Sequence, residues 1–115
     1  NLQLAQDNLE KLKEKKKIEL KKQLNSLNSA ENNKKSAELK LKNAENQFNL
    51  AEAQFEAGLI SEKEYTRQKM TYQQSKINYQ QAKDQLFLAE LNLTMLLNNN
   101  FSSINNEVLN NDRDN

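Results

Sequence analysis

The chain contains no proline, and its one glycine, Gly58, lies near the middle of its 115 residues. Proline breaks helices and glycine weakens them, so their near absence favours long helices. Only 36% of the residues are hydrophobic and 29% are charged, which is a small apolar core for a globular domain of this length. The sequence therefore predicts an all-α protein made of long, largely exposed helices.

Two stripes of residues repeat every seven positions on each side of Gly58. Before it, the stripes contain Leu27, Lys34, Leu41, Phe48 and Phe55, and Ala30, Ala37, Ala44, Ala51 and Gly58 itself. After it, they contain Tyr65, Tyr72, Tyr79, Leu86 and Leu93, and Gln68, Ser75, Ala82, Ala89 and Leu96. A disordered chain lacks such periodicity, and a seven-residue repeat with two seam positions indicates a coiled coil.

The segment FEAGLISEKEY, residues 55–65, predicts that one helix ends and another begins. Gly58 suits the left-handed residue that follows a helix C-terminus. Ser61 suits the N-cap of the next helix, and Glu64 completes a capping box with it. Ile60 and Tyr65 occupy the two positions of a hydrophobic staple.

These signals predict a long antiparallel helical hairpin over residues 1–98. The first helix is expected at about residues 2–57, the turn at 58–61 and the second helix at about 62–97. Large stripes should face small stripes across the seam. The register is ambiguous by one heptad, and the tighter alternative places Ala51 near Tyr65, Ala44 near Tyr72 and Ala37 near Tyr79.

The second helix carries further apolar residues off the seam, namely Met70, Ile77, Leu88, Leu91 and Met95. A helix with two apolar faces requires two neighbours, so we expect the hairpin to be part of a larger helical bundle. Residues 99–115 are rich in asparagine, which is a poor helix former, and are expected to be mostly irregular.

Catalysis finds no support in the composition. Histidine and cysteine are absent, and no glycine-rich phosphate loop or cluster of metal ligands is recognisable. We therefore expect no enzyme activity, no catalytic residue, no metal and no cofactor.

The net charge of +1 gives no overall attraction to nucleic acid. The lysine-rich residues 11–22 are interpreted as a solvated face, because Glu10, Glu14 and Glu19 each have a lysine three residues on.

The segment FEAGLISEKEY, with the heptads before it and the closing LNLTMLL at residues 91–97, resembles the TolC-like outer-membrane efflux proteins. The helical repeats of that family carry an aromatic residue, a glycine, an aliphatic residue, then Ser or Thr at the start of the next helix. Phe55, Gly58, Leu59, Ser61 and Glu64 fit this pattern. The resemblance covers roughly residues 16–98, with Asn98 where the family usually has glycine.

The resemblance implies a trimeric channel in the outer membrane, with this segment in the periplasmic α-barrel. The turn at Gly58, Leu59, Ile60 and Ser61 would be the tip at which a membrane-fusion adaptor and an inner-membrane pump dock. Glu64 matches the first of two acidic positions that narrow the pore in some members, and the second falls on Arg67. No signal peptide and no apolar run long enough for a membrane-spanning helix are recognisable. If the intact protein is exported, we expect this chain to be a mature or internal piece of it.

Two alternatives remain open. A periplasmic membrane-fusion adaptor has a similar hairpin, but Leu50 and Gln54 stand where the tip of that family has Arg and Leu. A structural coiled-coil module would need only the heptads, and it would leave the second apolar face unexplained.

Overall fold

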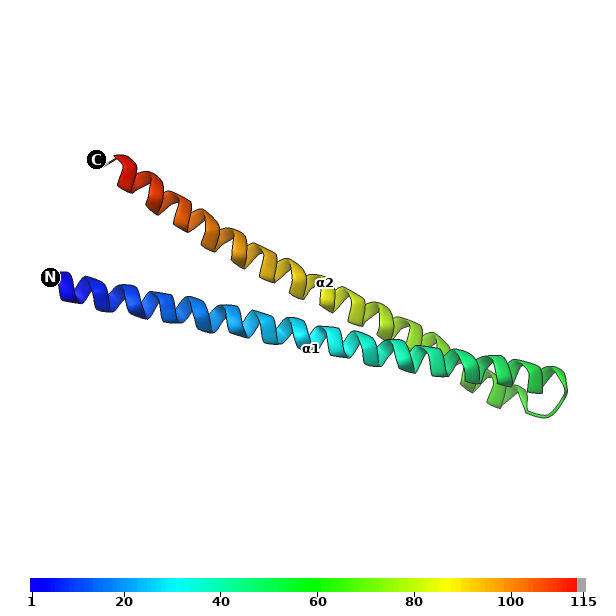
Figure 1. The fold of residues 1–115 in the computed structure, drawn as a ribbon. Helices are drawn as coiled ribbons and strands as arrows, with labels where there is room; N and C mark the ends of the chain where they lie inside the picture. Colours follow the sequence, from blue (N-terminus) through cyan, green and yellow to red (C-terminus); the bar gives the residue numbers. More distant parts are fainter. Residues whose placement is uncertain (114–115) are drawn as a thin grey trace. The chain divides into compact units, whose positions relative to one another are not determined.

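Two long helices make up the fold of the chain (Figure 1). The computed structural model describes the backbone of residues 1–113 and the side chains of residues 1–102. Helix α1 is Leu2–Glu56, with 55 residues, and helix α2 is Glu62–Arg113, with 52 residues. The described part of the chain contains no strand. The predicted all-α antiparallel hairpin is confirmed.

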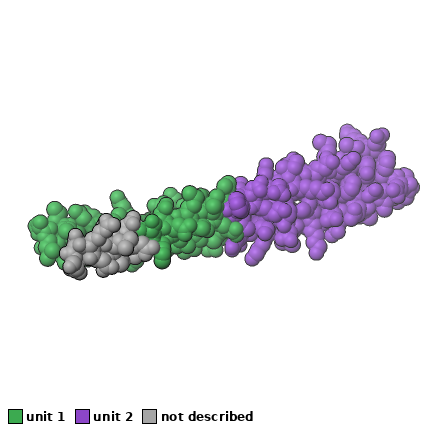
Figure 2. All heavy atoms as spheres, turned by 90° about the horizontal axis from the view of Figure 1, so that it is seen from above, with its two compact units in different colours: residues 1–28, 88–115 green, residues 29–87 purple. Residues whose placement is uncertain are grey.

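The chain divides into two compact units, which are coloured separately in Figure 2. One unit is Ser29–Phe87, and it contains the turn with the adjoining parts of α1 and α2. The other unit contains the beginning of α1, Asn1–Asn28, and the remainder of α2 from Leu88. We call Ser29–Phe87 the turn unit.

The core of the hairpin consists of alanines. The buried hydrophobic residues are Ala30, Ala44, Ala51, Ala82 and Ala89, all from the two predicted small stripes. Ala51 is the most deeply buried of them, at 3% exposure. The other stripe residues between Leu27 and Leu96 are half-buried, except that Phe55 and Gly58 are more exposed. The seven-residue repeat therefore locates the seam on both helices, because small side chains allow the helices to approach closely.

Aromatic rings from the two helices alternate along the seam of the turn unit. The ring of Phe48 lies between Tyr65 and Tyr72, with centroid distances of 5.7 and 5.3 Å. The ring of Phe55 stacks on Tyr65 at 4.7 Å. Each pair lies within the range for favourable aromatic stacking. The sequence predicted that the large residues of each helix would face the small residues of the other. Instead, the aromatic rings of the two large stripes stack directly on each other.

These ring distances also determine the register. Phe48 lies level with the midpoint between Tyr65 and Tyr72. In an antiparallel pair, Ala51 is then level with Tyr65 and Ala44 with Tyr72. The alternative register, shifted by one heptad, would place Phe48 between Tyr72 and Tyr79. The tighter of the two predicted registers is therefore confirmed.

The predicted end of the second helix near residue 97 and the irregular tail are wrong, because α2 continues to Arg113. Asparagine disfavours a helix interior by only a few tenths of a kcal/mol per residue relative to most polar residues, so it weakens a helix without breaking it. No proline or glycine follows Gly58 to interrupt the helix.

Candidate functional site

The turn between the helices begins with a Schellman motif centred on Gly58. The N–H of Leu59 donates to the carbonyl of Gln54 at 2.8 Å, and the N–H of Gly58 donates to the carbonyl of Phe55 at 3.0 Å. These two bonds satisfy carbonyls that the end of α1 would otherwise leave without partners. Gly58 has a φ of +76°, in the left-handed region. The predicted role of Gly58 as the helix-ending residue is confirmed.

Replacing Gly58 with valine is expected to lower the free energy of unfolding by about 1–3 kcal/mol. A Cβ at this position would meet no atom within 4 Å, so the loss comes from backbone strain and not from a clash. Urea unfolding followed by circular dichroism measures the change. Gly58→Asn is the matched control, and it should lose clearly less because asparagine tolerates a positive φ. Equal stability of Gly58→Val and the wild type would contradict the assigned turn.

Helix α2 begins at a serine cap. The Oγ of Ser61 accepts a hydrogen bond from the N–H of Glu64 at 3.1 Å, and the Ser61 carbonyl accepts from the N–H of Tyr65 at 3.0 Å. This is the serine half of the predicted capping box. Ile60, the residue before the cap, is half-buried, as is Tyr65, its predicted partner in the staple.

The carboxylate of Glu64 does not complete the capping box. It accepts hydrogen bonds from Arg67 Nη2 at 2.7 Å and from Gln68 Nε2 at 3.2 Å. The Arg67 hydrogen bond, followed by that of Gln68, holds the pKa of Glu64 below its ordinary value of 4.5. The same bond raises the pKa of Arg67. Glu64 and Arg67, the two residues that the sequence analysis compared with acidic pore positions, are thus an ion pair within one helix.

A shallow groove lies beside the turn, on the small-residue edge of the seam. Its volume is about 240 Å³. The lining residues come from the last turns of α1 and the first turns of α2: Gln47, Leu50, Ala51, Gln54, Ile60, Glu64 and Gln68. Next to it, Leu59 is exposed at the turn itself, with 75% of its surface accessible. The four predicted tip residues thus divide into Gly58 and Ser61, which shape the turn, and Leu59 and Ile60, which offer apolar surface.

The second apolar face of α2 is open to solvent. Met70, Ile77 and Leu91 are all exposed, and each lies five residues after a stripe residue of the tyrosine row. In a seven-residue repeat, that position is on the side of the helix opposite the seam. Leu88 and Met95, the other predicted members, are exposed as well. Asp84, also exposed, occupies the position between Ile77 and Leu91, so the row is apolar except for one charge. We call the row Met70, Ile77, Asp84 and Leu91 the outer row of α2.

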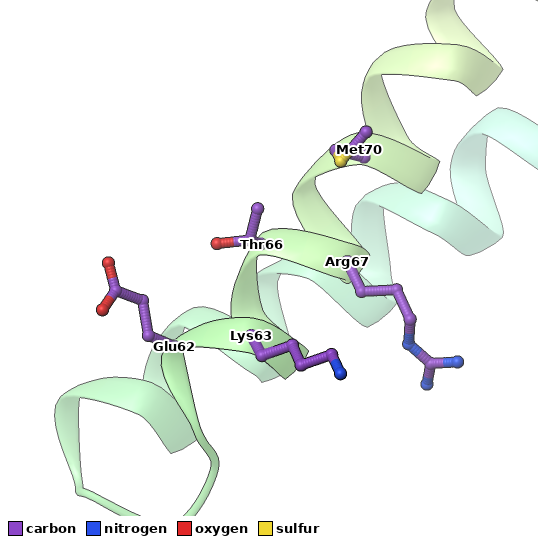
Figure 3. Close-up of a pocket in the computed structure, with 5 residues that line it drawn as sticks. All are labelled: Glu62, Lys63, Thr66, Arg67 and Met70. Atoms are coloured by element: carbon purple, nitrogen blue, oxygen red, sulfur yellow. The ribbon is translucent and has the colours of Figure 1, made fainter.

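The first part of this face forms a hollow of about 510 Å³ (Figure 3). All its lining residues belong to the first turns of α2: Glu62, Lys63, Thr66, Arg67 and Met70. Figure 3 shows Lys63 and Arg67 extending to one side of the helix, with Glu62 and Thr66 on the other side. The hollow therefore combines charged borders with an apolar end at Met70.

Two rows of opposite charge flank the aromatic edge of the seam, and the sequence analysis missed them. The row on α1 contains Glu31, Glu38, Glu45 and Glu52, and the row on α2 contains Lys69, Lys76 and Lys83. Both occupy the heptad position four residues after the large stripe, the position whose charges select partner and orientation in coiled coils. The ammonium groups of Lys76 and Lys83 lie 4.2 and 4.8 Å from the ring centroids of Tyr72 and Tyr79. Seven-residue spacing of charges was the signal that could have revealed these rows.

In the described residues, no group of three or more His, Cys, Asp or Glu side chains could hold a metal ion. Over the same residues, neither helix contains a segment apolar enough to cross a membrane. Comparison of the chain with family models, with curated proteins and with solved structures finds no match.

Proposed function

We propose that this chain is the helical-hairpin segment of a TolC-like outer-membrane channel for efflux or type I secretion. In this proposal it forms part of a periplasmic α-barrel in a homo-oligomer, a trimer in the family that it resembles. The turn at Gly58–Ser61 is the end at which an adaptor and an inner-membrane pump dock. The proposal extends the resemblance of residues 16–98, and the observation that carries it is the position of the outer row of α2.

A helix in a closed barrel of helices has a neighbour on each of two sides. Helix α2 has α1 on its seam side and an exposed row on the opposite side that is apolar at Met70, Ile77 and Leu91 and charged at Asp84. The equivalent row of α1 contains Asn32, Leu39, Asn46 and Ala53, two polar and two apolar residues, none of which is charged. An α2 outer row can therefore pack on the α1 outer row of the next hairpin, and repetition of this contact generates a ring.

The turn supplies the second line of support. The Schellman motif and the serine cap hold a rigid tip, from which Leu59 projects into solvent beside the groove at Leu50 and Ile60. Exposed apolar residues on a rigid scaffold are suitable for contact with a partner. The pairing of Glu64 with Arg67 weakens the case for a pore ring of unpaired acids, so we assign no gating role to Glu64.

Charge placed in the outer rows tests the proposal. Ile77, at 51% exposure, and Leu39, at 66%, are each replaced by glutamate, and self-association is measured by sedimentation equilibrium. A head-to-tail ring uses both rows, so each variant should weaken association at least tenfold, since a charge would be buried in an apolar contact. Gln85→Glu adds the same charge beside the seam and should have little effect.

The outcomes separate the candidates. Loss with both variants supports the ring that a channel requires. Loss with Ile77→Glu alone indicates that α2 pairs with α2 of a second copy, as in a structural coiled-coil module. No loss with either variant, or a wild-type chain that remains monomeric, would overturn the proposal.

A further inference from the structure

The beginning of α1 carries a concentration of positive charge that the proposed channel does not use. Residues 11–22 contain seven lysines and two glutamates, a net charge of +5, whereas the whole chain has a net charge of +1. All of the residues from 1 to 19 are exposed. A charge of this density on an exposed helix produces a strong local potential even when the chain as a whole is nearly neutral.

The lysines of this segment are not neutralised by their own helix. Glu10, Glu14 and Glu19 each have a lysine three residues on, and the sequence analysis interpreted this spacing as a solvated face. Among the residues whose side chains are described, the ion pair present is Arg67–Glu64, and residues 1–22 form none. Their positive charge therefore remains available to a partner.

One face of the segment combines lysines with aliphatic side chains. Lys11, Lys15, Ile18 and Lys22 follow the spacing i, i+4, i+7 and i+11, which places them on one side of a helix. Leu4 lies seven residues before Lys11 and continues the same side. Ile18 and Leu4 are 63% and 61% exposed. Asp7, Glu14 and Glu19 lie along the borders of this row, and none of them occupies a position in it. We call Leu4, Lys11, Lys15, Ile18 and Lys22 the basic face.

We propose that the basic face binds the surface of an anionic lipid bilayer, with α1 lying along it. Lysines near an anionic surface gain electrostatic attraction, while exposed aliphatic residues between them enter the headgroup region. The composition favours lipid over nucleic acid. The first aromatic residue is Phe48 and the first arginine is Arg67, so this segment has neither stacking platforms for bases nor forked donors for phosphates. The inference stands independently of the proposed function.

Flotation of the full-length chain with vesicles tests the proposal. The vesicles contain either phosphatidylcholine alone or phosphatidylcholine with phosphatidylglycerol at three to one. Binding is expected only to the anionic vesicles and should fall steeply as salt rises, because salt screens exposed charges. The triple variant Lys11→Gln, Lys15→Gln, Lys22→Gln should lower the partition coefficient on the order of a hundredfold, at roughly fivefold per lysine. Glutamine is a good helix former, so the helix content should not change.

A matched triple variant separates position from net charge. Lys35→Gln, Lys40→Gln, Lys42→Gln removes the same charge from α1 within the turn unit, and it should lower binding far less. Ile18→Gln should lower binding about fivefold to tenfold at constant charge, because its apolar surface no longer enters the bilayer. Equal loss in the two triple variants, or equal binding to neutral and anionic vesicles, would overturn the proposal. Tighter binding to a single-stranded or double-stranded oligonucleotide than to the anionic vesicles at the same salt would overturn it as well.

Discussion

Phe48→Ala is expected to lower the free energy of unfolding by about 2–4 kcal/mol. Phe48 lies between the rings of Tyr65 and Tyr72, so the variant removes two stacking contacts across the seam together with the burial of one ring. Thermal and urea unfolding, followed by circular dichroism at a concentration that keeps the chain in one association state, measures the loss.

Phe87→Ala provides the matched control. Phe87 belongs to the same turn unit, but 64% of its surface is exposed and it lies off the seam. The control should lose less than about 0.5 kcal/mol, as is usual for an exposed site. If both alanine variants lost the same amount, the ring stack would not be a source of stability in the seam.

Ala44→Leu is expected to destabilise the hairpin by about 1–3 kcal/mol through overpacking. Ala44 is buried in the seam level with Tyr72, where a larger side chain must push the two helices apart. Such a separation would also disturb the neighbouring stack of Phe48 on Tyr72. The near-ultraviolet circular dichroism of the tyrosines should therefore decrease along with the unfolding midpoint.

Ala53→Leu is the control for this second variant. Ala53 is an exposed residue of α1 on the side away from the seam, and leucine has nearly the helix propensity of alanine. Because Ala53 belongs to the outer row of α1, the comparison is made at a concentration at which the chain is monomeric. There, Ala53→Leu should change stability by only a few tenths of a kcal/mol. A gain in stability from Ala44→Leu would mean that the seam has room for a larger side chain, contrary to its burial.

The seam and the turn could be predicted, and the register to within one heptad, because each depends on spacing or on local backbone chemistry. A seven-residue repeat of Ala30, Ala44 and Ala51 implies one side of a helix whatever the rest of the molecule does. A lone glycine followed three residues later by serine supplies both caps of a turn. Such signals are local in the sequence, so no knowledge of tertiary structure was needed to use them.

Two features could not be obtained in this way. The ring stack depends on side-chain rotamers, and the rule that large residues face small ones does not say whether Phe48 turns toward Tyr65 or away from it. The end of α2 depends on the balance of many weak terms, since asparagines disfavour a helix slightly while no proline or glycine stops it. The partners of the Glu64 carboxylate were missed for a related reason, because Arg67 and Gln68, three and four residues on, compete for it with the Ser61 N–H that a capping box would use.

The ring stack also provides an optical probe that is confined to one part of the chain. All three tyrosines, Tyr65, Tyr72 and Tyr79, lie in the turn unit, and the sequence has no tryptophan. Tyrosine emission therefore reports on the turn unit alone, whereas far-ultraviolet circular dichroism averages over every helical residue. Melting curves recorded by the two signals would coincide for one cooperative transition, and they would separate if the distal ends fray first.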